Sequence, residues 1–216
     1  MIKVTAFRWV PPFAQGLVRD LRVRWALEEA GLPYEQMLIG PDDQKSAEYR
    51  RMQPFGQVPV MEDGDFTLFE SASIVMYIAE KSGTLLPRSA EDRARVLTWM
   101  FAALNSVEPH VSNLNLIDLF NAREEWAKQR RPAAEAGLRG RLESLSKALG
   151  GQSFLVGDSF TAADLLMTTV LRFLRHTPIV ADYPNLLAFK ERGEARPAFQ
   201  RALAAQMANF EKYQPA

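Results

Sequence analysis

A turn and a hairpin in the first third of the chain constrain its fold more than any other feature. Residues 56–64 read GQVPVMEDG: a Val-Pro turn, a short strand and an Asp-Gly turn. Glycine adopts positive φ without steric penalty, so Asp63-Gly64 between two apolar runs predicts a β-hairpin. Glu70-Ser71 follows, where the pattern changes to helical periodicity. The first N–H groups of a helix have no partners within it, so this junction can receive a carboxylate. These pieces predict a compact site for a small, extended, acidic, peptide-like molecule.

The rest of the first eighty residues alternates between strand and helix patterns. Helices are predicted over 17–30, where Gly31 ends the pattern, over 45–52 and over 71–81. Strands are predicted over 2–7 and 34–39. A β-α-β unit followed by a hairpin and a helix is the thioredoxin-like plan, in which the parallel strands need a crossover helix. The fold class is therefore an α/β thioredoxin-like N-terminal domain over residues 1–82.

Residues 83–89 form the predicted linker, and residues 90–216 have only helical patterns, which predicts an all-α C-terminal domain. Thr161 and Asp164 form a capping-box pattern before a helix that is apolar nearly all round, so that helix is expected at the centre of this domain. A helix over 123–149 is expected to break near Arg131-Pro132.

Composition excludes several classes of function. Lys+Arg 26 against Asp+Glu 26 gives no net charge, which argues against nucleic acid or a membrane surface as a partner, and Arg22 and Arg24 are interpreted as part of a solvated helix face. The absence of cysteine excludes a disulfide, an enzyme thiolate and a sulfur metal site. No metal site is expected from His110 and His176. Residues 2–7 alternate like a strand rather than a secretory signal, and no apolar run is long enough to span a bilayer, so a reducing cytoplasm is expected.

Three segments together resemble the cytosolic glutathione S-transferase superfamily: residues 26–35 (ALEEAGLPYE), the Val58-Pro59 hairpin with Glu70-Ser71, and residues 157–164 (GDSFTAAD). The resemblance covers nearly the whole chain. It implies glutathione as co-substrate, a cis Pro59, backbone pairing of Val58 with the cysteinyl part, and Glu70 with Ser71 at the γ-glutamyl end. It also implies that Gln44 and Gln57 lie near the glycyl carboxylate, and that the protein is a homodimer.

One part of the pattern departs from that family. Members usually activate the glutathione thiol with a Tyr, Ser or Cys after the first strand, but residues 8–21 (RWVPPFAQGLVRDL) contain none of these and no Thr. Three replacements stay open. The favoured one is Gln15, together with the N–H groups at the start of the first helix. Arg19 could supply positive charge, and Trp9 could offer its indole N–H.

The predicted function is conjugation of glutathione to small hydrophobic electrophiles. Two alternatives remain: glutathione-dependent isomerisation or peroxide reduction, and a non-catalytic glutathione or hydrophobic-ligand binder or scaffold. The second substrate is expected in a mostly apolar pocket with a few polar groups. Its candidate residues are Trp9, Phe13, Trp99, Phe101, Asn105 and His110.

Overall fold

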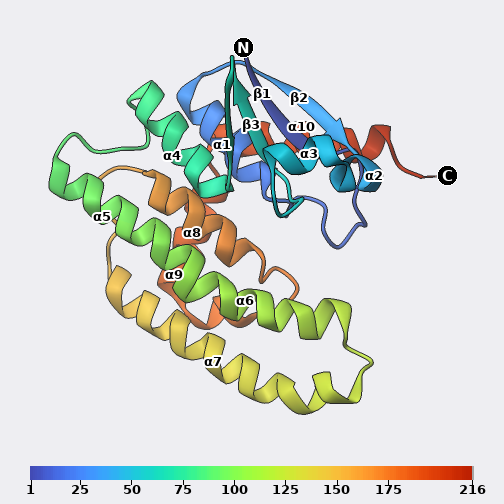
Figure 1. The fold of residues 1–216 in the computed structure, drawn as a ribbon. Helices are drawn as coiled ribbons and strands as arrows, with labels where there is room; N and C mark the ends of the chain where they lie inside the picture. Colours follow the sequence, from blue (N-terminus) through green and yellow to red (C-terminus); the bar gives the residue numbers. More distant parts are fainter. Residues whose placement is uncertain (216) are drawn as a thin grey trace. The chain divides into compact units, whose positions relative to one another are not determined.

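The protein is described by a computed structural model of residues 1–215, which divides into two compact units (Figure 1). The first unit comprises Met1–Leu86 and the C-terminal segment from Arg196, and the second comprises Pro87–Ala195. The C-terminal helix thus belongs with the N-terminal residues. The domain limits expected from the sequence stay a prediction.

The first unit contains a four-stranded sheet in the order β2-β1-β3-β4. Strands β1 and β2 are parallel, and β3 is antiparallel to both β1 and β4. Helix α1 packs against both α4 and α10. This is the predicted β-α-β unit followed by a hairpin and a helix. Its elements are β1 (Ile2–Phe7), α1 (Asp20–Ala30), β2 (Tyr34–Ile39), α2 (Pro41–Lys45), α3 (Ala47–Met52), β3 (Val60–Asp63), β4 (Phe66–Phe69), α4 (Ser71–Ser82) and α10 (Pro197–Lys212).

Helix α1 ends as predicted but begins later than predicted. Gly31 has φ +64°, and the Leu32 N–H donates to the Leu27 carbonyl at 3.0 Å, which is a Schellman ending. The helix begins at Asp20, however, and not at Leu17. The residues before it form turns instead, because Gly16 has φ +75° and cannot lie in a right-handed helix.

The predicted hairpin is confirmed with its turn shifted by one residue. Asp63 pairs with Phe66, so Gly64 and Asp65 form the two-residue loop, and Gly64 has φ +62°. The Val58–Pro59 peptide bond before the hairpin is cis, as the resemblance implied.

The second unit is helical throughout. Its first helical stretch runs without interruption from Ala90 to Phe120, and it contains two π-helical segments that the sequence did not reveal. The elements are α5 (Ala90–Phe101), η1 (Ala102–Val107), α6 (Glu108–Asn115), η2 (Leu116–Phe120), α7 (Glu125–Leu149), α8 (Ala162–Arg172), the 3₁₀ helix η3 (Ile179–Asp182) and α9 (Pro184–Glu194).

Helix α7 contradicts the expected break at Arg131-Pro132, because it continues through Pro132. Pro132 is exposed, so the Lys128 carbonyl that loses its helical partner lies on the side of the helix where water can hydrogen-bond to it. Ala127 and Ala134 are buried on either side of the proline and keep the helix packed. The free energy gained by burying one face of α7 therefore exceeds the cost of the single backbone hydrogen bond that Pro132 removes.

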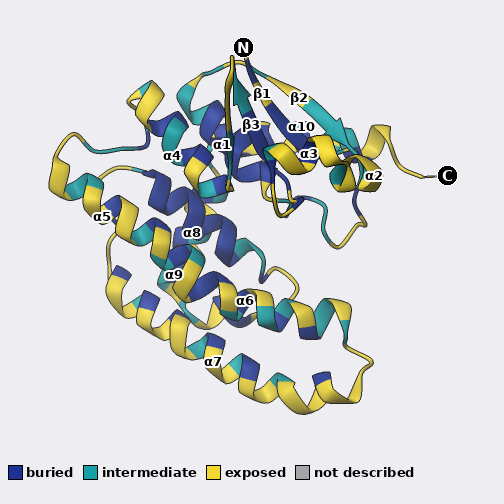
Figure 2. Cartoon of the chain, viewed as in Figure 1, coloured by how far each residue is buried: buried dark blue, intermediate teal, exposed yellow. Residues whose placement is uncertain are grey.

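Helix α8 is buried along almost its whole length, as predicted (Figure 2). Its capping box is confirmed: Asp164 Oδ2 accepts from the Thr161 N–H at 2.8 Å and from the Thr161 hydroxyl at 2.7 Å. Asp164 Oδ1 also accepts from the Leu155 N–H at 2.8 Å, which ties the preceding loop to the helix start.

Candidate functional site

The strand register of the first unit brings the predicted glutathione residues to one end of the sheet. Strands β1 and β3 pair Val4 with Met61, and the same register carried onward brings Phe7 level with Val58. In the hairpin Val60 pairs with Phe69, so Pro59 comes level with Glu70. The carboxyl end of β1, the turn before β3 and the start of α4 therefore meet at the same end of the sheet.

The segment before Val58 is held by a buried tyrosine. The Tyr49 hydroxyl donates to the Gln57 carbonyl at 2.6 Å, and burial raises the pKa of that hydroxyl, so it remains a donor. The Thr5 hydroxyl lies 3.2 Å from the Tyr49 hydroxyl and accepts from the Val60 N–H at 2.6 Å. These bonds fix the backbone on both sides of Val58-Pro59, where a peptide-like ligand would pair with the chain.

Glu70 and Ser71 lie at the start of α4 in different environments. Glu70 is exposed and has φ +69°, a conformation that is uncommon outside glycine, and its carbonyl accepts the Ile74 N–H at 3.0 Å. Ser71 is buried, and its hydroxyl accepts from Arg22 Nη1 at 3.2 Å. An exposed carboxylate thus adjoins a buried hydroxyl and the first N–H groups of a helix.

Arg22 and Arg24 correct the interpretation of the first helix. Both were expected on a solvated face, but Arg22 is 2% exposed and Arg24 is fully buried. Arg24 Nε donates to the buried Asp20 Oδ2 at 2.6 Å, and Gln206 from α10 donates to Asp20 Oδ1 at 2.7 Å. Helix α1 is packed against the sheet, α4 and α10, so even the charged side chains of Asp20, Arg22 and Arg24 lie inside the unit.

Gln44 and Gln57 both lie at the loop that precedes the cis peptide. The Gln44 side-chain amide donates to the Gly56 carbonyl, and Gln57 is exposed. Gly56 has φ +64°, a backbone conformation that residues with a side chain rarely adopt, so this loop favours glycine. The Gln44 amide group therefore supports the loop shape through a bond that the sequence did not predict.

The thiol-activation candidates are placed differently from expectation. The Gln15 amide donates to the Val10 carbonyl at 3.1 Å, and the Leu17 N–H donates to the Ala14 carbonyl at 3.0 Å. Gln15, Gly16 and Leu17 precede α1, so the expectation that they open the helix is wrong. Arg19 occupies the N-cap position of α1 and is exposed.

Trp9 has a polar atom that the surrounding fold does not satisfy. Its indole nitrogen is shielded from solvent and has no hydrogen-bond partner within residues 1–215. Trp9 follows β1 by two residues, at the sheet end where Val58 and Glu70 meet. A buried donor without an acceptor costs about 1–3 kcal/mol, so an acceptor supplied by a ligand would be favourable there once the side chain or its loop moves to expose the N–H.

The remaining second-substrate candidates have varied surroundings. Phe13 is 43% exposed in the first unit. In the second unit Trp99 is half-buried, and Phe101 and Asn105 are exposed. His110 Nε2 accepts from Arg141 Nε at 3.2 Å, so this histidine is tied to α7. Their shared role in a substrate pocket stays a prediction.

Residues 1–215 contain no group of three or more His, Cys, Asp or Glu side chains arranged to hold a metal ion. Among the same residues, no helix combines the length and the apolar character needed to cross a membrane.

Comparison with known proteins assigns both halves of the chain to one family. Residues 14–80 match the N-terminal domain of glutathione S-transferase, and residues 115–206 match its C-terminal domain. A glutathione S-transferase from Zea mays is 33% identical over 202 residues, covering 86% of this chain and 88% of that protein. One from Hyoscyamus muticus is 30% identical over 194 residues, covering 85% of this chain and 92% of that protein.

Solved structures support the same family assignment. A glutathione transferase from Burkholderia graminis, with two glutathione molecules bound per subunit, matches with a TM-score of 0.82 and 26% identity, covering 94% of this chain and 88% of that one. The chain therefore belongs to the glutathione S-transferase family, with a thioredoxin-like N-terminal and a helical C-terminal part. The prediction of an enzyme of the transferase class is confirmed.

Proposed function

We propose that this protein conjugates glutathione to small hydrophobic electrophiles. The observation that carries the proposal is the convergence of the Val58 turn, Glu70 and Ser71 at one end of the sheet in a chain of this family. Val58 pairs through its backbone with the cysteinyl part of glutathione. Gln57 lies near the glycyl carboxylate of glutathione. Gln44 contributes to the same end indirectly, because its side-chain amide donates to the Gly56 carbonyl and stabilises the loop.

The γ-glutamyl end is bound by two complementary groups. The exposed Glu70 carboxylate attracts the ammonium group. The Ser71 hydroxyl accepts a hydrogen bond from Arg22 and keeps its own hydrogen to donate to the γ-glutamyl carboxylate. The first N–H groups of α4 add a favourable partial positive charge.

The thiol is activated by a hydrogen bond to sulfur. A free thiol has a pKa of about 8.5, and a donor aimed at the sulfur stabilises the thiolate. Of the candidates, we favour the Trp9 indole N–H, because the Gln15 amide is already bonded to the Val10 carbonyl and Arg19 is exposed. The proton leaves to solvent, the thiolate attacks the electrophile, and a thioether forms as the leaving group departs or the acceptor bond is saturated.

The proposal also covers the second substrate, the oligomeric state and the cellular location. The proposed contacts to the second substrate are Trp9 and Phe13 in the first unit, and Trp99, Phe101, Asn105 and His110 in the second. The protein works as a cytoplasmic homodimer and contains no metal. A detoxifying role follows from the breadth of electrophiles that an apolar pocket accepts.

Turnover of an electrophile panel with product analysis tests the proposal. Haloaromatic, unsaturated carbonyl, isomerisable and hydroperoxide substrates are each supplied with glutathione. A thioether product that is lost in Glu70→Gln supports conjugation. Isomer or alcohol as the main product would favour the isomerase or peroxidase alternative. No product from any substrate, despite glutathione binding, would favour a non-catalytic binder.

A further inference from the structure

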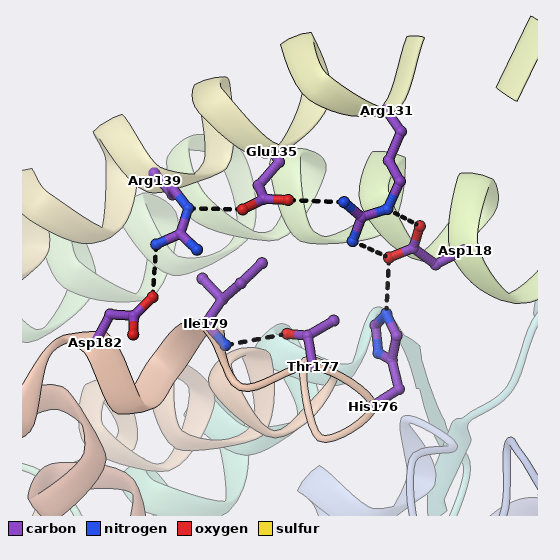
Figure 3. A network of polar contacts seen from close by, with 8 residues as sticks. All are labelled: Asp118, Arg131, Glu135, Arg139, His176, Thr177, Ile179 and Asp182. Atoms are coloured by element: carbon purple, nitrogen blue, oxygen red, sulfur yellow. Dashed lines mark hydrogen bonds and ion pairs between the residues drawn. The ribbon is translucent and has the colours of Figure 1, made fainter. Parts of the chain in front are cut away.

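The two units contain ion-pair networks of different kinds. In the second unit, a partly exposed chain of alternating charges fastens α7 to η2 and η3, and charge is matched within it (Figure 3). Its members are Asp118, Arg131, Glu135, Arg139 and Asp182. The first unit instead buries its ion pair, because the side chains of Asp20 and Arg24 are each 1% exposed. A buried pair of this kind needs further hydrogen bonds to be stable.

Helix α10 brings a polar side chain to this buried pair. Arg196, directly before α10, donates to the Glu29 carboxylate through two bonds of 2.5 and 2.8 Å. Such a bidentate pair fixes orientation as well as distance, and it holds the first turn of α10 against the last turn of α1. The two helices are therefore antiparallel, and Gln206 of α10 reaches Asp20 at the start of α1.

Gln206 joins the buried pair to the loop before α1. Gln206 is 1% exposed, and its amide nitrogen donates to Asp20 Oδ1 at 2.7 Å and to the Val18 carbonyl at 3.2 Å. Gln206 Oε1 is shielded from solvent and has no hydrogen-bond partner within residues 1–215. A half-satisfied buried amide costs stability that an apolar side chain would not, so packing alone does not account for a glutamine here.

Val18 lies between Gln206 and the turn that is proposed to bind glutathione. The Val18 side chain packs against the buried cluster that contains Val58. The Gln15 amide bond described above joins the loop, residues 8–19, only to itself. Gln206 adds a bond from a distant helix, at the loop residue that contacts this cluster. The end of the loop is therefore fixed beside the Val58 turn.

We infer that Gln206 is a positioning residue for activation of the glutathione thiol. The inference rests on the proposed function, in which Val58 pairs with the cysteinyl part and Trp9 donates to the sulfur. Gln206 holds the end of the loop at Val18, so that the movement which exposes the Trp9 N–H keeps the indole close to the Val58 turn. A hydrogen bond weakens steeply when its donor is misaligned, so a loop released at Val18 would stabilise the thiolate less well.

Gln206→Met tests this role, because it keeps the length of the side chain and removes both donated bonds. Asn209→Ala is the matched control, since Asn209 lies three residues later on α10 and donates to Gln36 of β2 rather than to the loop. Calorimetry gives the affinity for glutathione, and the pH dependence of ultraviolet absorbance gives the thiol pKa of the bound tripeptide. Amide hydrogen exchange over residues 8–19, without ligand, reports the loop. Gln206→Asn, which is one methylene shorter, is used if the methionine variant does not fold.

We expect the pKa of the bound thiol to rise toward that of free glutathione in Gln206→Met, so that the thiolate fraction at neutral pH falls about three- to ten-fold. Exchange over residues 8–19 should become about ten-fold faster, while the affinity changes by less than about three-fold, because the γ-glutamyl site is untouched. Asn209→Ala should match the wild type in all three measurements.

A purely structural role would lower the unfolding temperature of Gln206→Met and leave the thiol pKa and the loop exchange at their wild-type values. That result would overturn the inference and leave the proposed function intact, as would equal effects of Gln206→Met and Asn209→Ala. A wild-type protein that binds no glutathione, or binds it without forming a thiolate, would contradict the proposed function itself. The role of Gln206 in activation would then be overturned as well, before any variant is compared.

Discussion

The Arg22 guanidinium donates to the Ser71 hydroxyl at 3.2 Å, and both side chains are buried. This pair joins α1 to the start of α4 beneath the exposed Glu70. A cation that donates to a hydroxyl polarises it and leaves its hydrogen for an acceptor. The relationship explains why a serine at a helix start can act as a carboxylate-binding group rather than only as a cap.

Ser71→Ala should therefore weaken glutathione binding about ten-fold, which corresponds to the loss of one hydrogen bond to a charged group. Ser73→Ala, on an exposed position of the same helix, is the control and should leave the affinity unchanged. Calorimetric titration measures both. Equal affinity of the Ser71 variant and wild type would remove Ser71 from the site.

Tyr49→Phe removes the hydroxyl that donates to the Gln57 carbonyl. We expect a loss of about 1–2 kcal/mol in the free energy of unfolding, because the buried bond is lost, together with weaker glutathione binding. Urea denaturation and glutathione titration measure the two effects. Tyr213→Phe, near the C-terminus, is the control. A stability loss with unchanged affinity would show that Tyr49 does not position the Val58 turn for the ligand.

Trp9→Phe keeps an apolar ring and removes the unsatisfied indole N–H. Stability should stay the same or rise, because a buried donor without a partner is removed, while the pKa of bound glutathione should rise toward that of the free thiol. The pH dependence of kcat/KM reports that pKa. If Gln15→Ala or Arg19→Ala shifts the profile and Trp9→Phe does not, the thiol donor is one of the other two residues.

Asp164→Ala removes the acceptor of three hydrogen bonds at the start of α8. We expect a loss of about 2–4 kcal/mol in the free energy of unfolding. The exposed Asp158→Ala in the same loop should change stability by less than about 0.5 kcal/mol. Thermal unfolding compares the two. Equal losses would mean that the loop, and not the capping box, sets the stability of this region.

The Asp63 carboxylate makes stability depend on pH. Hydrogen bonds from Lys81 and then from Tyr77 hold the pKa of Asp63 below its usual value. Because the folded pKa is lowered, the stabilisation is present above the unfolded pKa of about 3.9 and is lost as pH falls through the folded pKa. Asp63→Asn should flatten this acid limb in denaturant titrations below about pH 4. Asp65→Asn, exposed in the hairpin loop, should not.

Features with local signals were predictable from the sequence. Gly31, the Asp63-Gly64 hairpin and the Thr161–Asp164 capping box each need only a few neighbouring residues, and all three are confirmed. The gathering of the turn, Gln44 and Glu70 at one sheet end followed from strand order and the resemblance, whereas their binding roles stay predictions.

Features set by tertiary packing were missed. Burial of Arg22 and Arg24 depends on helices from distant parts of the chain, and the charge pattern alone indicates the opposite. The π-helical segments have no residue signature in Ala102–Val107 or Leu116–Phe120. The orphaned Trp9 nitrogen depends on which acceptors the folded loop brings near it, and this is not encoded in the spacing of its neighbours.

Titration of the wild-type protein with glutathione tests the central claim most directly. Calorimetry gives the affinity and the stoichiometry per subunit, and the ultraviolet absorbance of the bound tripeptide at neutral pH reports its thiolate. The account predicts saturable binding together with a thiolate signal, which disappears in Trp9→Phe while binding remains. Binding without a thiolate would contradict the proposed activation, and no binding at all would contradict the proposed function while leaving the fold intact.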